Sequence, residues 1–383
     1  MNDIKEIKKE RLKKKVKKII KNTYAFMFLR AIKVVLDKSY FPEMERKNIF
    51  IRYIDNLKWI FKYHRVNYSY NLFGLDIKNF RKQDDYVDIK YIKRERLKEH
   101  HKYDAQASHR DENITIRYSI LADNKHLFYS YMDSISKNLV PKTYMVVNKN
   151  KVVTPFDSKF YNKNLKEAIG LLPNGKYIFK SCIGAMGKSI SVIAKSEKGV
   201  ILNNGSRQLD ELIEETNLEP YLIQEYVHQH EKLSAINPET VNTLRIISTR
   251  WNEDTHILAA MLRVGSESSQ LVDNASIGGS FVGINYNNGK LMKYGYYYNK
   301  PKETHHPISN VKYEDYQIPY WEETIDLITK LHPILYGFST IGWDIAITEK
   351  GPIIIEINWN YSVKGIQIAS GGFRKRWEEL KKK

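Results

Sequence analysis

The first 36 residues alternate apolar side chains with lysines. The first apolar positions recur at mostly helical spacing, and they are Ile4, Ile7, Leu12, Val16, Ile19 and Ile20. A more apolar stretch, residues 24–36, follows and is broken only by Arg30 and Lys33. The pattern predicts a basic amphipathic helical segment over residues 1–36. Contact with an acidic membrane leaflet and a plain solvated lysine face explain it equally well, and nucleic-acid binding explains it less well.

The rest of the chain divides into two patterns. Residues 37–119 mix short helical patterns with charged loops and contain no chemical motif, which predicts an N-terminal helical or mixed region. From about Ile116 onward, strand-like runs alternate with turns rich in Gly, Asn and Pro. Helical stretches are predicted at residues 124–136, 209–215 and 321–332. This alternation predicts an α+β or α/β enzyme core.

Composition and charge narrow the class of protein. The 383 residues allow two or three lobes, and 42% apolar with 12% aromatic residues is typical of a globular protein, which excludes a collagen or a mucin-like stalk. The net charge of +18 indicates anionic partners, such as nucleic acid, anionic lipid or acidic glycan. Residues 1–21 hold ten Lys or Arg against three acids, so much of the charge lies in one segment.

Cysteine content and hydropathy favour the cytoplasm. Cys182 is the single cysteine, which excludes an internal disulfide framework and a cysteine metal cluster. The longest uncharged apolar stretch near the N-terminus, residues 24–29, is far shorter than the roughly 20 residues that span a bilayer. The lysine-rich residues before it lack the apolar core of a signal peptide. We therefore expect a cytoplasmic protein.

A glycine-containing turn separates two strand-like runs within residues 177–194. A Walker P-loop is rejected, because Cys182 stands where its first glycine is required and the run after the turn alternates like a strand. The pattern predicts a hairpin whose backbone N–H groups close over phosphates, with Lys180 as a phosphate cation. The residues of the turn are Gly184, Gly187, Lys188 and Ser189. Taken alone, an ordinary turn explains this pattern better.

A second apolar run, residues 221–227, contains Gln224 and Glu225 near its end. Such a strand can present backbone groups to an adenine ring while the glutamate accepts a hydrogen bond from its amino group. Taken alone, an ordinary surface strand is the better explanation.

The most informative stretch is a pair of apolar runs joined by a short turn, residues 341–348 and 351–360. Asp344, Glu356 and Asn358 lie at the polar ends of these runs. Glu356 and Asn358 share one face, because side chains of a strand repeat every two residues. Their oxygens are the hard ligands that Mg²⁺ prefers. Burying so much negative charge without a cation is costly, so we expect a metal site.

In this order the features resemble the ATP-grasp superfamily over residues 120–372. The resemblance implies an α+β ATP-grasp fold of two lobes that hold ATP, preceded by a helical, basic extension and followed by a basic tail, residues 373–383. It implies that Lys125 and Lys180 bind phosphates, under the glycine hairpin. It assigns the adenine hinge to Gln224, Glu225 and Val227, and ribose contact to residues 228–231, with Glu231 as the ligand. It implies two Mg²⁺ ions, bound by the Asp, Glu and Asn set named above.

Further segments are similar to the sugar-transfer-associated ATP-grasp proteins: residues 236–246, 262–265 and 272–279. Within them Arg245 and Arg263 are candidates for contact with a γ-phosphate, an acyl phosphate or a substrate carboxylate, against the alternative of structural salt bridges. Candidate substrate residues are Asn242, Asp273, Asn274, Gly278, Gly279 and His306. Plain loop or surface roles remain the alternatives for these.

The resemblance implies an ATP-dependent carboxylate–amine ligase that uses an acyl phosphate, with Lys180, Arg245 and Arg263 as catalytic residues. The expected substrates are an amino acid and an anionic sugar or glycan in capsular or O-antigen polysaccharide biosynthesis. Peripheral contact with an anionic membrane, at its inner face, would also account for the basic N-terminus. An ATP-grasp kinase and a non-catalytic module that binds glycan or membrane are the alternatives. A nucleic-acid partner is disfavoured, because no reading motif accompanies the charge.

Overall fold

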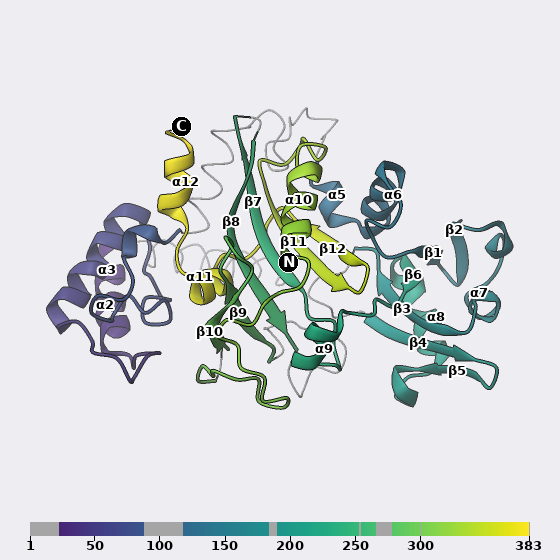
Figure 1. Ribbon diagram of the computed structural model, residues 1–383, viewed down its shortest axis with the longest axis horizontal. Helices are drawn as coiled ribbons and strands as arrows, with labels where there is room; N and C mark the ends of the chain where they lie inside the picture. Colours follow the sequence, from purple (N-terminus) through teal and green to yellow (C-terminus); the bar gives the residue numbers. More distant parts are fainter. Residues whose placement is uncertain are drawn as a thin grey trace, which may run out of the picture. The chain divides into compact units, whose positions relative to one another are not determined.

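The computed structural model describes residues 23–87, 118–183, 190–252, 254–265, 278–298 and 300–382. The chain forms two compact units, residues 1–93 with 363–383, and residues 94–362 (Figure 1). Most of the predicted basic segment, the glycine turn at 184–189, and Asp273 with Asn274 lie outside the described residues. In the part that is described, no helix is long and apolar enough to cross a membrane.

The first unit is helical. Its elements are α2 (Tyr24–Leu36), α3 (Ile49–Tyr63), η1 (Gln83–Asp85), α11 (Lys364–Ser370) and α12 (Arg374–Leu380). Thr23 and Asn48 cap the first two helices by accepting hydrogen bonds from backbone N–H groups of the first turn, and α2 is the described part of the helix predicted over residues 1–36. Trp59, Ile60 and Tyr63 are among the side chains that fill the core beneath α3.

The end of the chain completes this helical unit. Gln367 on α11 accepts a hydrogen bond from the backbone N–H of Val87 at 2.8 Å and donates one to its carbonyl at 2.9 Å. Arg374 donates to the carbonyl of Asp84 at 2.6 Å. From the sequence we placed residues 363–372 in the domain that carries the strands, whereas these bonds tie them to the helical unit.

The second unit contains two antiparallel sheets. The order of the first is β2-β1-β6-β3-β4-β5, and its strands are β1 (Thr143–Asn148), β2 (Lys151–Pro155), β3 (Gly175–Ser181), β4 (Ile190–Ser196), β5 (Gly199–Leu202) and β6 (Tyr221–Glu225). The order of the second is β10-β9-β8-β7-β11-β12, with β7 (Leu244–Trp251), β8 (Asp254–Val264), β9 (Ser280–Ile284), β10 (Leu291–Tyr296), β11 (Thr340–Thr348) and β12 (Gly351–Asn358).

Helices accompany each sheet of the second unit. They are α5 (Ile120–Asp123), α6 (Lys125–Ile135), η2 (Ser158–Phe160), α7 (Leu165–Leu171), η3 (Asn203–Gly205), α8 (Leu209–Leu218), α9 (Glu231–Ile236) and α10 (Trp321–Leu331). The helices predicted near residues 124, 209 and 321 are therefore confirmed as α6, α8 and α10, and β3 and β4 are the two strands predicted around the glycine turn. The fold is α+β.

Two apolar clusters stabilise the two sheets, and the larger one contains residues of both. Phe179 and Tyr221 stack at a centroid distance of 4.5 Å in the core of the first sheet, beside Ile223. Trp343 is buried in the core of the second sheet, where its indole N–H donates to Ser248 at 2.7 Å. Two rigid sheets therefore present the polar side chains of their strands from fixed positions.

Candidate functional site

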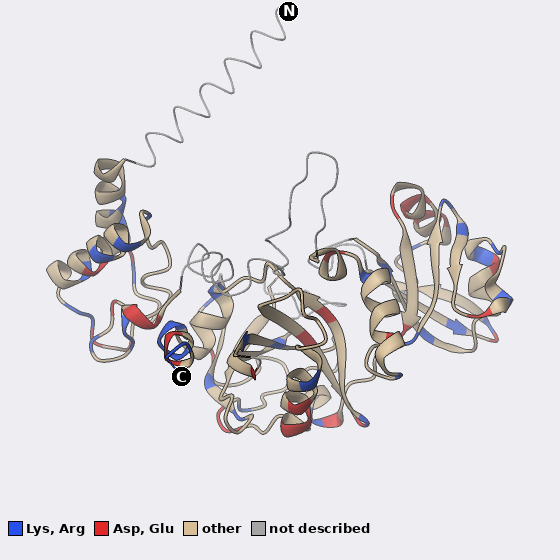
Figure 2. Cartoon of the chain, turned by 90° about the horizontal axis from the view of Figure 1, so that it is seen from above, with Lys and Arg blue, Asp and Glu red and all other residues tan. Residues whose placement is uncertain are grey.

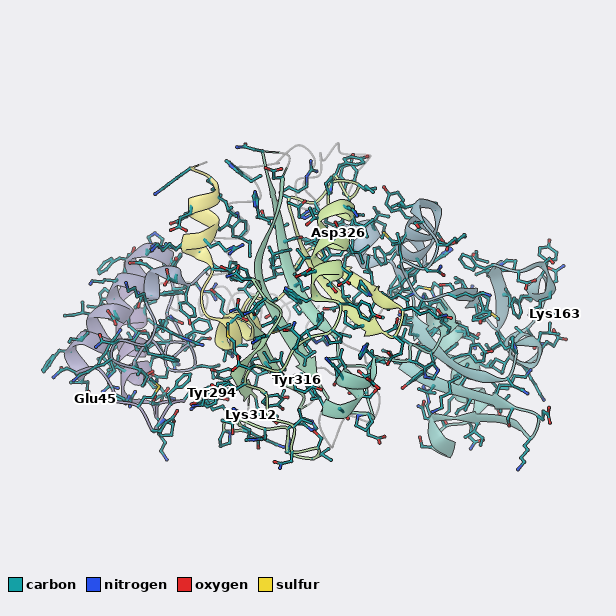
Figure 3. The ribbon with its side chains drawn as sticks, in the orientation of Figure 1. Glu45, Lys163, Tyr294, Lys312, Tyr316 and Asp326 are labelled. Carbon is teal, nitrogen blue, oxygen red and sulfur yellow. The ribbon has the colours of Figure 1, made fainter. Side chains whose placement is uncertain are left out.

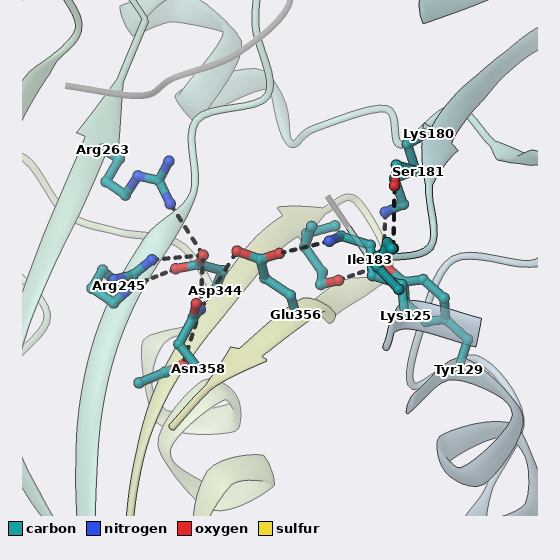
Figure 4. Close-up of polar contacts among 12 residues, drawn as sticks. Lys125, Tyr129, Lys180, Ser181, Ile183, Arg245, Arg263, Asp344, Glu356 and Asn358 are labelled. Carbon is teal, nitrogen blue, oxygen red and sulfur yellow. Dashed lines mark hydrogen bonds and ion pairs between the residues drawn. The ribbon is translucent and has the colours of Figure 1, made fainter. Parts of the chain in front are cut away.

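One face of the second sheet carries a row of charged side chains, Arg263, Arg245, Asp344 and Glu356, which we call the charged row. The strand register sets it: Asp344 on β11 lies opposite Arg245 on β7 and opposite Glu356 on β12. Arg263 on β8 lies two residues beyond Met261, which pairs with Arg245, so both arginines point to the same side. Figure 4 shows the row.

Asp344 is buried between the two arginines. Arg245 holds both carboxylate oxygens, with Nε at 2.5 Å from Oδ1 and Nη2 at 2.8 Å from Oδ2, and Nη1 of Arg263 is 3.1 Å from Oδ2. Burial alone would raise the pKa of Asp344, but the two positive charges outweigh it and hold that pKa well below its usual range. Asp344 is therefore a carboxylate that stays ionised although it is buried.

Glu356 has the opposite electrostatics. Burial, and then the charge of Asp344 across the strand pair, raise the pKa of its carboxyl group. The ammonium of Lys125 is 3.9 Å from its Oε2 atom, too far for a close hydrogen bond. Glu356 thus carries negative charge that its protein neighbours only partly compensate.

The predicted metal ligands lie together at this point. Nδ2 of Asn358 is 3.4 Å from an oxygen of Asp344 and 3.4 Å from an oxygen of Glu356. The described residues contain no group of three or more His, Cys, Asp or Glu side chains that could hold a metal, so a site here consists of two carboxylates and one amide. This donor set fits Mg²⁺, since a divalent cation would also relieve the repulsion that raises the pKa of Glu356.

Lys125 on α6 and Lys180 on β3 both lie near Glu356. Lys125 is the first residue of α6, which Asn124 caps, and its backbone N–H donates to the carbonyl of Cys182 at 2.8 Å. Lys180 is buried, and burial followed by the charge of Lys125 lowers its pKa to about 7. Two lysines that repel one another beside a carboxylate are suited to bind an anion.

Tyr129 fixes the position of Lys180. The Lys180 ammonium donates to the Tyr129 hydroxyl at 2.7 Å, and that hydroxyl donates to the carbonyl of Ile355 at 2.5 Å (Figure 4). Ile355 directly precedes Glu356 on β12. The chain of hydrogen bonds therefore connects the lysine of the first sheet to the carboxylate strand of the second.

The predicted hinge residues occupy the end of β6 and the segment that follows it. Gln224 is buried and donates to the carbonyl of Pro141 and the hydroxyl of Thr143, while Glu225 accepts a hydrogen bond from the backbone N–H of Lys142. Val227 lies beyond the last paired residue of β6, and Glu231 begins α9 with an exposed side chain.

The predicted substrate residues are dispersed by comparison. Asn242 is fully buried, and its amide donates to Gln229 and to two backbone carbonyls. His306 is buried in a turn, where its ring contacts the Ser309 hydroxyl at 3.1 Å. Gly278 and Gly279 precede β9, Gly278 with a φ of 104° that favours glycine. The structure brings none of these four into hydrogen-bond contact with the charged row among the described contacts.

A family model for sugar-transfer associated ATP-grasp proteins matches residues 107–382. The chain belongs to this family. Members of the ATP-grasp superfamily generally use ATP and Mg²⁺. The charged row with Lys125 and Lys180 is therefore the candidate for the site at which such a fold would bind nucleotide and metal.

Similar solved structures are ATP-grasp proteins with low sequence identity. They include the D-alanine–D-alanine ligase of Helicobacter pylori, which is 13% identical with a TM-score of 0.37 over 69% of this chain and 59% of that one. N5-carboxyaminoimidazole ribonucleotide synthetase with ADP is 12% identical with a TM-score of 0.38, over 64% of this chain and 46% of that one. This chain thus matches about half of the length of those proteins. No curated protein matches it in sequence.

Two features of this candidate site are not apparent from the sequence motifs. The grip of both arginines on Asp344 depends on strands that are far apart in the chain, so no local signal reveals it. Tyr129 had a usable signal: it lies four residues after Lys125 on the predicted helix, and side chains at that spacing share a face.

Asp344→Asn and Glu356→Gln each remove one negative charge, and we expect opposite effects on stability without Mg²⁺. Asp344→Asn removes the buried carboxylate that Arg245 and Arg263 share and should cost about 3–5 kcal/mol of unfolding free energy. Glu356→Gln removes a repulsion and should raise the Tm by about 2–4 °C, the change that about 1 kcal/mol produces. Thermal unfolding measures both values.

The pH dependence of these variants provides a second check. The pKa of Glu356 is higher in the folded state than its value of about 4.3 in an unfolded chain, so the folded protein binds the extra proton. Stability of the unsubstituted protein therefore falls as pH rises from about 4.3 through the raised pKa. The advantage of Glu356→Gln should grow over the same range; an advantage that is constant from pH 5 to 9 would contradict this account.

Nucleotide binding should take up protons near neutral pH. Lys180 is only partly protonated at pH 7–8 because its pKa is about 7, and phosphate groups beside it raise that pKa. Calorimetry of Mg-ATP binding in two buffers of different ionisation enthalpy measures the uptake. Lys180→Arg, which keeps its charge at every pH, should abolish it; unchanged uptake in that variant would assign the proton to another group.

Tyr129→Phe removes the acceptor that holds Lys180 and should weaken Mg-ATP binding about tenfold, equivalent to about 1.4 kcal/mol. Tyr131→Phe is the matched control, because Tyr131 lies on the same helix and donates to the carbonyl of Ile334 instead. Equal losses in the two variants would show that helix packing, and not the position of Lys180, determines affinity.

Proposed function

We propose that this protein is an ATP-dependent carboxylate–amine ligase that works through an acyl phosphate and joins an amino acid to a sugar carboxylate or amine in capsular or O-antigen polysaccharide biosynthesis. The observation that carries the proposal is the charged row, which meets Lys125 and Lys180. Two carboxylates, an amide and two lysines at one place suit a polyphosphate with its metal ions. The sugar-transfer associated family supports the polysaccharide setting.

Each group of residues has a proposed role in this reaction. Asp344, Glu356 and Asn358 would hold Mg²⁺, two ions in our proposal, which neutralise phosphate charge when bound. Lys125 and Lys180 bind the phosphates. Tyr129 keeps the Lys180 ammonium directed toward them, and its contact with β12 keeps it in register with Glu356.

The arginines of the charged row suit the acyl phosphate. Arg245 and Arg263 converge on Asp344 from neighbouring strands, so their positive charge lies beside the metal ligands. A planar guanidinium binds a carboxylate or phosphate with two parallel hydrogen bonds. We propose that they steady the substrate carboxylate and then the acyl phosphate.

The reaction needs no covalent bond to the protein. A carboxylate oxygen attacks the γ-phosphorus of ATP, and the bond from that phosphorus to the bridging oxygen of ADP breaks. The amine then attacks the acyl carbon, the bond from that carbon to the phosphate oxygen breaks, and the amine loses a proton. Each turnover therefore yields one amide, ADP and phosphate. The protein contributes position and charge stabilisation.

The partners in this proposal are a small amino acid and an anionic sugar or glycan acceptor. The net charge of +18 supports an anionic acceptor, because a positive surface concentrates it near the protein.

The test measures ADP and phosphate release from Mg-ATP across a panel of amino acids with uronic and amino sugars. We expect ADP, free phosphate and a new amide mass, all abolished in Glu356→Gln. Asp326→Asn is the matched control, because Asp326 is an exposed carboxylate on α10 that pairs with Lys330 (Figure 3). ADP with a phosphorylated acceptor would make the protein a kinase, and a protein that does not bind Mg-ATP would exclude the ligase.

A further inference from the structure

Helix α2 has apolar residues on two opposite sides. The residues on one side are buried in the core, and they are Met27, Ala31, Val34 and Val35. The other side exposes Leu29, Ile32 and Leu36, which follow one another at helical spacings of three and four residues. A surface helix usually exposes polar residues opposite its core side, so the second stripe is not explained by folding of this unit.

Helix α3 repeats the arrangement. Its buried side contains Trp59 and Ile60. Phe50, Ile54 and Phe61 lie on the other side at spacings of four and seven residues. Together the exposed stripes of the two helices form what we call the α2–α3 face, whose six side chains are between 43% and 75% exposed.

The two stripes border one another. The ring of Phe61 lies 5.7 Å from that of Tyr24 and 5.9 Å from that of Phe28, so the α3 stripe meets α2 at Phe61. At the other end of the pair, Arg52 of α3 donates to the carbonyl of Val35 at 2.6 Å. The helices therefore run antiparallel, and their exposed apolar residues belong to one surface. A contiguous patch of this kind marks an interaction site.

Basic side chains accompany the α2–α3 face. Figure 2 shows Lys and Arg along both helices, and the exposed ones are Arg30, Lys33, Lys58 and Lys62, the last of them paired with Asp84. α2 contains no acidic residue, and Asp55 of α3 is paired with Lys47. Residues 1–36 hold twelve Lys or Arg against three acids. The partner must therefore be both apolar and anionic.

We propose that the α2–α3 face binds the surface of a lipid bilayer that contains anionic lipid, with its apolar residues at the boundary of headgroups and acyl chains. Large apolar residues beside lysines and arginines are the combination by which interfacial helices bind such membranes. Nucleic acid offers the charge but no apolar layer for six exposed Leu, Ile and Phe side chains. The contact is peripheral, and it does not depend on the ligase proposal.

The test is co-sedimentation of the full-length protein with vesicles of phosphatidylcholine alone or with one quarter phosphatidylglycerol. We expect binding to the anionic vesicles and at least tenfold weaker binding to the neutral ones. Leu29→Gln, Phe50→Gln and Ile54→Gln combined should weaken binding to the anionic vesicles at least tenfold. These positions are exposed and avoid the aromatic contacts of Phe61.

The matched control combines Ile201→Gln, Leu218→Gln and Ile308→Gln, which remove three equally exposed apolar side chains from the unit of the two sheets. It should bind vesicles like the unsubstituted protein. Mg-ATP binding and thermal unfolding verify that both triple variants are folded.

Three outcomes would overturn the proposal. Equal vesicle binding by the α2–α3 variant and the unsubstituted protein would assign membrane binding to the basic residues alone. An equal loss of vesicle binding in both triple variants would show that binding is not specific to the α2–α3 face. Absence of vesicle binding, with a dimer in sedimentation velocity that only the α2–α3 substitutions dissociate, would identify a second copy of this chain as the occupant.

Discussion

The buried ion pair of Asp344 with Arg245 and Arg263 is the interaction on which the arrangement of the site depends. A carboxylate taken out of water is stable only when opposite charge lies against it. The two arginines provide that charge: Arg245 comes from β7, which pairs with β11, and Arg263 from β8, the next strand beyond β7. Burial raises the pKa of Glu356, and the ionised Asp344 across the next strand pair raises it further. One ion pair therefore influences the charge of both candidate metal-binding carboxylates, Asp344 and Glu356.

The site is electrostatically unfavourable in the absence of its ligands, and this is consistent with binding. Glu356 and Lys180 both have pKa values displaced toward their neutral forms, the first because of burial and Asp344, the second because of burial and Lys125. Each is relieved by a ligand of opposite charge: a cation for the glutamate and a phosphate for the lysine. In the proposed function, stability lost in the free protein would be recovered as affinity for a nucleotide with its metal ion.

The local sequence pattern was sufficient to predict which candidate metal ligands share a face. It was not sufficient to predict which arginine pairs with Asp344. The alternation of residues 341–360 predicted that Glu356 and Asn358 share a face, and the structure brings both to Asp344, because a two-residue period is a property of any strand. The Arg245–Asp344 pair could not be predicted, since it depends on the register of strands about 100 residues apart. Tyr129 was missed, although its position four residues after Lys125 on the predicted helix places both side chains on one face.

The helical unit is an integral part of this chain and cannot be removed as a separate extension. The family model ends at residue 382, so α11 and α12 lie within the matched region, yet both are parts of the helical unit. The two hydrogen bonds of Gln367 satisfy the buried backbone N–H and carbonyl of Val87. Removal of residues 23–87 or of the C-terminal segment would leave buried polar groups of the other segment without these bonds. The chain must therefore fold residues 23–87 together with its C-terminal end. The helical unit that carries the α2–α3 face is therefore joined to the ATP-grasp strands twice along the chain, once before α5 and once after β12.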